Sequence, residues 1–76
     1  MAKTKHYPPE GFTERLRDLW IMSGLTQGQI AQRIGYERKV VHAWIYGDHT
    51  PNVTALAKIC YIFGVSADYL LFGKEK

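Results

Sequence analysis

Residues 25–47 read LTQGQIAQRIGYERKVVHAWIYG, and this stretch decides the fold of the 76-residue chain. Thr26 is a typical helix N-cap, and Gly35 predicts the end of the helix that begins there. The inward stripe of this helix is formed by Ile30, Ala31 and Ile34, which recur at the spacing of one helix face. A helix of only about eight residues is too short to be stable alone, so we expect it to pack against its neighbours.

The rest of this stretch predicts another helix over residues 37–46, which begins near Glu37 and ends before Gly47. At about 100° per residue, one arc of this helix is apolar and must be buried: Val40, Val41, Trp44 and Ile45. The opposite arc carries Arg38, Lys39, His42 and Ala43. The turn between the two helices is at Gly35, where the absent Cβ permits a sharp change of direction. Together they form a helix-turn-helix.

A helical pattern also precedes this motif. We expect a first helix over residues 10–23, ended by Gly24. Helical periodicity places four residues on its inward face: Phe12, Leu16, Leu19 and Ser23. The same periodicity turns three charged residues toward water: Glu14, Arg17 and Asp18.

Two further helices are predicted after the motif. The first is capped by Asn52 and ends at Gly64, and its inward residues are Leu56, Ile59, Cys60 and Phe63. The second is capped by Ser66 and ends at Gly73. Because no window shows the period-two alternation of a strand, the predicted fold class is all-α, a compact five-helix bundle.

The chain is short enough for one domain only. We expect a flexible basic arm over residues 1–9, a folded domain over 10–73 and a short charged tail over 74–76. In the arm, Pro8 and Pro9 oppose helix formation. Lys3 and Lys5 are either solubilising charges or contacts to a nucleic-acid groove. The net charge of +3 permits attraction to nucleic acid without requiring it.

Several classes of protein are excluded by what the sequence lacks. The single cysteine, Cys60, cannot form an internal disulfide and is expected in the core, as suits a reducing cytoplasm. No signal peptide or membrane span is present. The three histidines, His6, His42 and His49, fit no metal-ligand spacing. No catalytic motif occurs, so we expect no enzyme, cofactor, metal or small-molecule ligand.

The motif and its surroundings resemble a known family. The matching residues are Leu25-Thr26-Gln27, Ile30-Ala31, Ile34-Gly35, Val41, Trp44, Gly47, Pro51, Leu56 and residues 64–71, GVSADYLL. In this pattern the chain is similar to the Cro and lambda-repressor-like helix-turn-helix proteins, often called XRE-type regulators. The resemblance covers about residues 12–73, and it implies a lambda-repressor-like DNA-binding bundle.

The resemblance also implies roles for individual residues. Contacts to DNA phosphates are expected from Thr26, Gln27, Tyr46, His49 and Asn52. Base edges in the major groove would be read by Glu37, Arg38, Lys39, His42 and Ala43. Among these, an arginine is suited to guanine and a glutamate to cytosine, although Glu37 also repels phosphate.

The chain departs from the family at two places. Glu37 stands where the family often has a Ser or Thr cap on the reading helix. Trp20 and Ile45 stand where many members carry a charged pair between the first helix and the end of the third. We expect an apolar contact there, which can be as stabilising as an ion pair.

These features predict a sequence-specific, double-stranded DNA-binding transcriptional regulator, a repressor that pairs as a weak homodimer. The expected dimer surface consists of Ile62, Tyr69, Leu71 and Phe72. Because the sequence ends soon after the fifth helix, we expect no attached effector domain. The alternative is an antitoxin-like or anti-repressor protein that acts through protein binding. The salt dependence of binding distinguishes the two hypotheses, because counterion release makes DNA binding steeply salt-dependent.

Overall fold

Five helices make up the regular structure of residues 9–74, the part of the chain that the computed structural model describes. They are α1 (Phe12–Ser23), α2 (Gln27–Ile34), α3 (Arg38–Tyr46), α4 (Val53–Phe63) and α5 (Ala67–Phe72). No strand occurs within these residues, so the predicted all-α fold class is confirmed. Within the same range, no helix is both long enough and apolar enough to cross a bilayer. Residues 1–8 of the expected arm and 75–76 of the tail lie outside the described residues.

The helix ends follow the capping residues seen in the sequence. Thr26 Oγ1 accepts a 3.0 Å hydrogen bond from Gln29 N, and Gln29 Oε1 accepts one of 2.8 Å from Thr26 N, a capping box. Asn52 caps α4 through a 2.8 Å bond from Ala55 N. α2 ends at Gly35, whose φ of 81° lies in the left-handed region that a Cβ disfavours. The turn into α3 therefore depends on this glycine.

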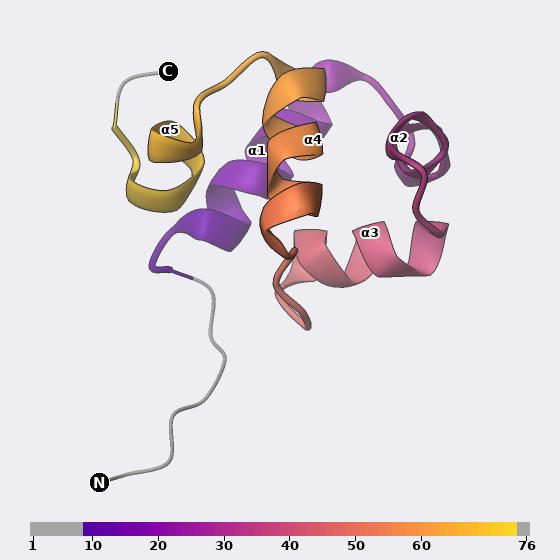
Figure 1. Ribbon diagram of the computed structural model, residues 1–76, viewed down its shortest axis with the longest axis horizontal. Coiled ribbons are helices and arrows are strands. Elements are labelled where there is room, and N and C mark those ends of the chain that lie inside the picture. Colours follow the sequence, from indigo (N-terminus) through magenta and orange to yellow (C-terminus); the bar gives the residue numbers. More distant parts are fainter. Residues whose placement is uncertain (1–8, 75–76) are drawn as a thin grey trace, which may run out of the picture.

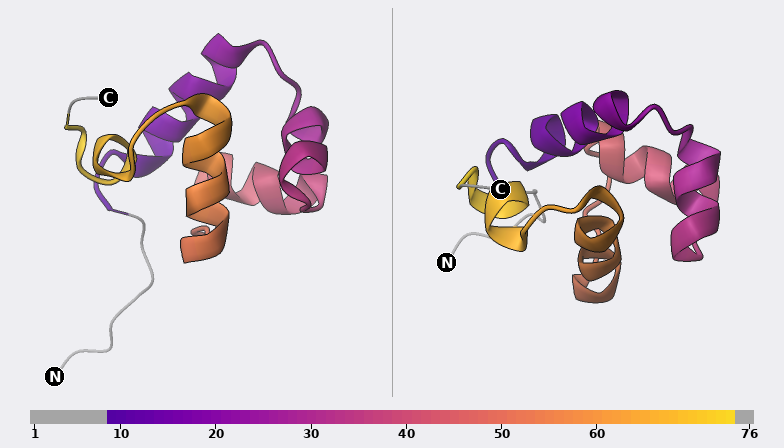
Figure 2. Two further views of the ribbon diagram at one scale, coloured as in Figure 1. Left: turned by 45° about the horizontal axis from the view of Figure 1, so that its top comes forward. Right: turned by 90° about the horizontal axis from the view of Figure 1, so that it is seen from above.

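The helices surround a single apolar core. Figure 1 shows α3 running beneath α4, with α2 at one side of the bundle and α5 at the other. Figure 2 shows α5 lying beside the N-terminal part of α1 in both views, where Arg15 Nε donates a 2.9 Å hydrogen bond to Leu70 O. The buried residues are Phe12, Leu16, Leu19, Ile30, Ala31, Ile34, Val41, Trp44, Ile45, Ala55, Ile59 and Leu70.

One helix boundary and several details of the predicted helix faces were wrong. α1 begins at Phe12 rather than residue 10, and Ser23 is exposed because its hydroxyl donates to Trp20 O near the helix end. Arg17, expected in water, is half-buried against α3. Val40 is only half-buried, because the buried arc of α3 is centred on its neighbour Val41.

α4 is rotated slightly from its expected orientation. Its fully buried residues are Ala55 and Ile59, whereas Leu56, Cys60 and Phe63 are half-buried and pack against the core. The small side chain of Ala55 lets the helix approach closely, so its neighbours are covered on one side only. Desolvation raises the pKa of the Cys60 thiol, which favours the neutral thiol expected of a core cysteine.

Candidate nucleic-acid interface

The N-terminus of α2 presents backbone donors to the surface. In an α-helix the first four amides have no partner within the helix. At the start of α2, Thr26 N donates to Gln29 Oε1 and Gln29 N donates to Thr26 Oγ1. The amides of Gln27 and Gly28 remain, at the positive end of the helix dipole. This arrangement suits an anion such as a phosphate.

A hydrogen bond joins α2 to α3 beside these amides. Gln27 Oε1 lies 3.0 Å from His42 Nδ1, so His42 donates from Nδ1 when the Gln27 oxygen accepts. The side-chain amide nitrogen of Gln27 then keeps its own two donors. The residue expected at a phosphate and a residue expected at the bases are thus held together across the motif.

The C-terminal end of α3 is fastened to α1 by a cluster that the sequence did not reveal. Arg17 Nη2 donates a 3.3 Å hydrogen bond to Ile45 O, and its guanidinium carbon lies 5.1 Å from the centre of the Tyr46 ring. Trp20 contacts the same ring edge-on, with centroids 6.4 Å apart. Trp20 therefore packs on Tyr46, the neighbour of Ile45, and the apolar contact expected between Trp20 and Ile45 stays a prediction. The available signal was the three-residue spacing of Arg17 and Trp20 in α1, which places them on one side of the helix.

Tyr46 also contacts one of the residues of α3 that are expected to read bases. The His42 and Tyr46 rings are 4.6 Å apart at 39°. His42 is consequently held by Gln27 on one side and by Tyr46 on the other. Tyr46, predicted to contact phosphate, is about half exposed and also serves as this packing surface.

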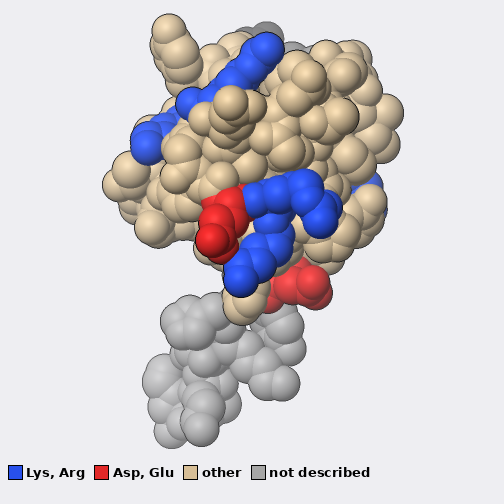
Figure 3. All heavy atoms as spheres, turned by 90° about the vertical axis from the view of Figure 1, so that its right-hand side faces the viewer, with Lys and Arg blue, Asp and Glu red and all other residues tan. Residues whose placement is uncertain are grey.

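The outward side of α3 begins with two basic residues, Arg38 and Lys39, and Glu37 precedes them as the N-cap. Arg38 and Lys39 are exposed, and Arg38 forms no hydrogen bond or ion pair with another described residue. Lys39 Nζ lies 3.7 Å from Glu37 Oε1, with both side chains more than 70% exposed, so the pair contributes little to stability. Figure 3 faces the side with α2 and the start of α3, and shows basic side chains gathered at its centre beside an acidic one.

A hollow of about 360 Å³ lies between α3 and the loop that follows it. It brings together four of the predicted site residues, Lys39, His42, Ala43 and His49, with Val40 and Asp48. Asp48 is not among the residues predicted from the sequence, although it is a charged residue in the expected contact loop. Its carboxylate repels phosphate and suits a hydrogen-bond donor on a base edge.

Two of the residues predicted to contact phosphate also act as helix caps. Thr26 and Asn52 already accept amide hydrogen bonds as helix caps, which leaves the Thr26 hydroxyl and the Asn52 amide group as donors. Their DNA contacts, like those of the remaining expected residues, stay predictions.

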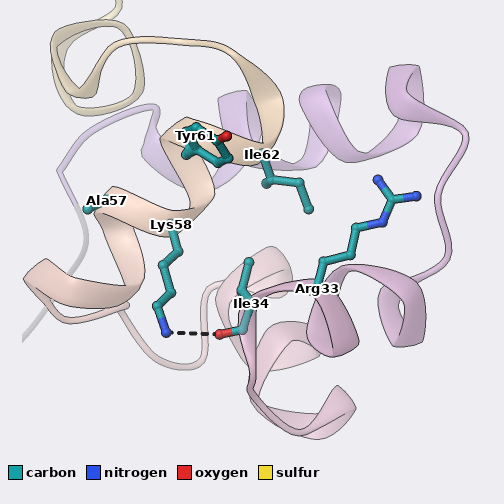
Figure 4. A pocket seen from close by; sticks show the side chains of 6 residues that line it. All are labelled: Arg33, Ile34, Ala57, Lys58, Tyr61 and Ile62. Carbon is teal, nitrogen blue, oxygen red and sulfur yellow. Dashed lines mark hydrogen bonds between the residues drawn. The ribbon is translucent and has the colours of Figure 1, made fainter.

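The expected dimer surface is not one continuous patch. Figure 4 shows Ile62 directed from α4 toward α2, whereas α5 lies on the other side of α4 in Figure 1. On α5, Tyr69 and Leu71 are half-buried, and Phe72 is 64% exposed. Ile62 is thus separated from the three residues of α5.

The fold and motif define a helix-turn-helix protein, and comparison with known proteins agrees. Residues 16–70 match the family model described as Helix-turn-helix, so the chain belongs to that family. It superposes on the P22 c2 repressor, solved in complex with a synthetic operator, with a TM-score of 0.78 and 24% identity, covering 83% of this chain and 96% of that one. This match confirms the predicted lambda-repressor-like fold.

Two curated relatives are also similar over 84% of this chain. The HTH-type transcriptional activator BcrR of Enterococcus faecalis is 36% identical over 64 residues. An uncharacterized HTH-type transcriptional regulator, YqaE of Bacillus subtilis, is 34% identical over 64 residues. The aligned part spans 31% of the first relative and 55% of the second.

Proposed function

We propose that this chain is a sequence-specific DNA-binding transcriptional regulator that inserts α3 into the major groove and has no catalytic role. The observation that carries the proposal is the 3.0 Å contact between Gln27 and His42. This contact holds the N-terminus of α2, whose free amides suit a phosphate, beside α3, whose exposed side chains are expected to read bases. A major groove about 12 Å wide admits one such helix.

The division of labour follows from the positions of the side chains. Gln27, Thr26 and the α2 amides would bind one phosphate, while Tyr46, His49 and Asn52 would contact the backbone beyond α3. Glu37, Arg38, Lys39, His42 and Ala43 would face base edges. Phosphate contacts set the register and base contacts set the specificity.

We propose that the regulator is a repressor, because a protein that represses by occupying an operator needs no contact with a further protein. We also propose a weak homodimer on a two-fold symmetric operator, since a single module buries only about 600–1,000 Å². Half-sites would lie about one helical turn apart. Phe72 and Leu71 on α5 are the principal candidates for this contact, with Tyr69 beside them and Ile62 at a separate position.

Selection from random duplexes, followed by titration of two variants, tests the DNA contacts. Arg38→Ala should weaken operator binding by about 1–3 kcal/mol and relax the preference at one base pair, as expected for a lost bidentate guanine contact. Gln27→Ala should weaken binding to all duplexes, because its contact is to phosphate, and it should also broaden the base preference near His42, whose hydrogen bond is lost. An Arg38→Ala variant with parental affinity and preference would contradict the proposed register.

A double variant, Leu71→Ser with Phe72→Ser, tests the dimer. It should reduce cooperativity on a full operator and leave half-site affinity unchanged, as measured by sedimentation and operator titration. A double variant that fills both half-sites as the parent does would exclude α5 as the interface.

An antitoxin-like or anti-repressor role is the second candidate, and one observation favours it: Tyr61 on α4 is 90% exposed. Duplex binding that falls steeply with salt supports the regulator. Absence of duplex binding at low salt, with retained folding, would favour the protein-binding role.

A further inference from the structure

The outer face of α4 is apolar although it is exposed. Val53, Ala57 and Tyr61 are spaced four residues apart, so they lie along one side of the helix. Val53 is 84% exposed and Tyr61 is 90% exposed. The only charged residue of this helix is Lys58. Exposed apolar residues that are aligned in this way, rather than scattered, indicate an interaction surface.

A hollow of about 800 Å³ adjoins this face, between α4 and the C-terminal end of α2. Its lining residues are Arg33, Ile34, Ala57, Lys58, Tyr61 and Ile62. Figure 4 shows Ile62 and Ile34 between the two helices, with Arg33 toward one end and Lys58 toward the other. The hollow therefore has an apolar centre flanked by cations.

The two cations differ in how they are held. Lys58 Nζ donates a 3.2 Å hydrogen bond to Ile34 O and lies 5.5 Å from the centre of the Tyr36 ring. Its charge is thus fixed at the edge of the hollow. Arg33 is exposed and forms no ion pair with another described residue. Neither α2 nor α4 contains an Asp or Glu, so no acidic side chain of these helices neutralises the two cations.

We propose that this groove binds an acidic amphipathic helix of a partner protein. Its apolar residues would cover Ala57, Tyr61 and Ile62, and its carboxylates would pair with Arg33 and Lys58. Amphipathic helices commonly bind apolar grooves in this manner. Complementary charge at the rim would select the partner and orient it.

The same observations disfavour other occupants. A second copy of this chain, paired through the same groove about a two-fold axis, would bring a cation rather than a carboxylate to Arg33 and to Lys58, and like charges would repel. A DNA backbone would satisfy the cations but leave the apolar centre uncovered. The groove is at the C-terminal end of α2, and the candidate nucleic-acid interface includes its N-terminal end. The partner could therefore bind while DNA is bound.

A display library of helical peptides of about sixteen residues, long enough to form a helix on binding, tests this proposal. Selection on the full chain should enrich peptides with an apolar stripe flanked by Asp and Glu. An enriched peptide, added to isotope-labelled protein, should shift the amide resonances of Arg33, Ile34, Ala57 and Tyr61. Residues on α3 should be unaffected.

Two variants and two matched controls measure the contributions of charge and apolar contact. Arg33→Glu and Tyr61→Ala should each reduce peptide affinity about tenfold or more, a change typical of a principal interface residue. Lys74→Glu makes the same charge reversal, and Ile21→Ala truncates another exposed apolar side chain on α1. Both controls should change affinity by less than about twofold.

Four results would overturn the proposal. They are enrichment of neutral or basic peptides, equal enrichment on the Arg33→Glu variant, displacement of the peptide from this groove by duplex DNA, and the absence of any enriched peptide. These measurements need no operator, so their outcome is independent of the proposed function.

Discussion

α3 and α4 are similar in length and differ in what they show to solvent. Each buries one side in the shared core, through Trp44 and Ile45 on α3 and through Ala55 and Ile59 on α4. The outer side of α3 begins with Arg38 and Lys39. That of α4 carries Val53 and Tyr61. Core packing accounts for the inner faces, so the outer faces distinguish a candidate DNA-binding helix from a candidate protein-binding helix.

The two helices also differ in how they are held. α3 is connected to α2 by the Gln27–His42 hydrogen bond and to α1 by the bond from Arg17 to Ile45 O. α4 is connected to α2 by the hydrogen bond that Lys58 donates to Ile34 O. A helix that reads bases has to be held at a fixed angle, and the two connections of α3 suit that requirement.

The largest expected effect comes from truncating a buried aromatic residue on the inner face of α3. Trp44 is 4% exposed and its ring contacts Tyr36 edge-on with centroids 5.1 Å apart. Trp44→Ala should reduce the free energy of unfolding by about 3–5 kcal/mol, the usual range for a buried aromatic. Thermal and urea denaturation measure it.

Tyr61→Ala is the matched control on α4, because it removes an aromatic ring that is 90% exposed. Its effect should stay within about 0.5 kcal/mol. Equal destabilisation by the two changes would show that the inner and outer faces have been assigned wrongly.

A smaller effect is expected from breaking the connection between α1 and α3. Arg17→Ala removes the donor to Ile45 O and the cation above Tyr46. We expect a loss of about 1–2 kcal/mol in unfolding free energy, within the range for hydrogen bonds. Because Tyr46 packs against His42, the base preference near His42 should broaden as well.

Arg17→Lys distinguishes positioning from charge. It keeps the cation but loses the planar group that stacks on a ring, so base preference should remain broadened while net charge is unchanged. A Lys variant with the parental preference, measured by duplex selection, would show that Arg17 acts through charge alone.

The sequence predicted the helices well because their ends are marked by local chemistry. Thr26, Asn52 and Ser66 are all N-caps in the structure, since a cap requires only a side-chain oxygen within three residues of an amide. The glycines at the C-terminal ends, such as Gly35, are equally local. Local signals of this kind are independent of how the helices cross.

The candidate site was predicted less completely because its contacts depend on those crossings. The cluster of Arg17, Trp20 and Tyr46 joins residues from two helices, and their distances follow from the angle between α1 and α3. Helical periodicity placed Arg17 in water because it treats each helix alone. In α4, the choice of Ala55 over Leu56 as the buried residue likewise depends on how closely the helix approaches its neighbours.

The smallest expected effect separates stability from DNA binding at one backbone position. Gly28 lies in the first turn of α2, and a Cβ there would be 3.8 Å from Arg38 Cδ and 3.9 Å from Thr26 Oγ1, which is ordinary van der Waals contact. Gly28→Ala should therefore raise the free energy of unfolding by about 0.5–1 kcal/mol, the usual gain for a helical glycine. Glycine also permits the close approach of a backbone to a ligand. Since the Gly28 amide is a proposed phosphate donor, affinity for specific and non-specific duplexes should fall together by a few-fold.

Ala57→Gly on the outer face of α4 is the matched control for this change. It should lower the free energy of unfolding by a similar amount, about 0.5–1 kcal/mol, and leave duplex affinity unchanged, because α4 contributes no proposed DNA contact at that position. Denaturation of the two variants should show opposite changes in stability, and titration should show a loss of duplex affinity for Gly28→Ala alone. If Gly28→Ala raised stability and left duplex affinity at the parental value, phosphate would not approach this turn of α2. The anion site would then consist of the Gln27 side chain without the adjoining amides, and the proposed interface would shift toward α3.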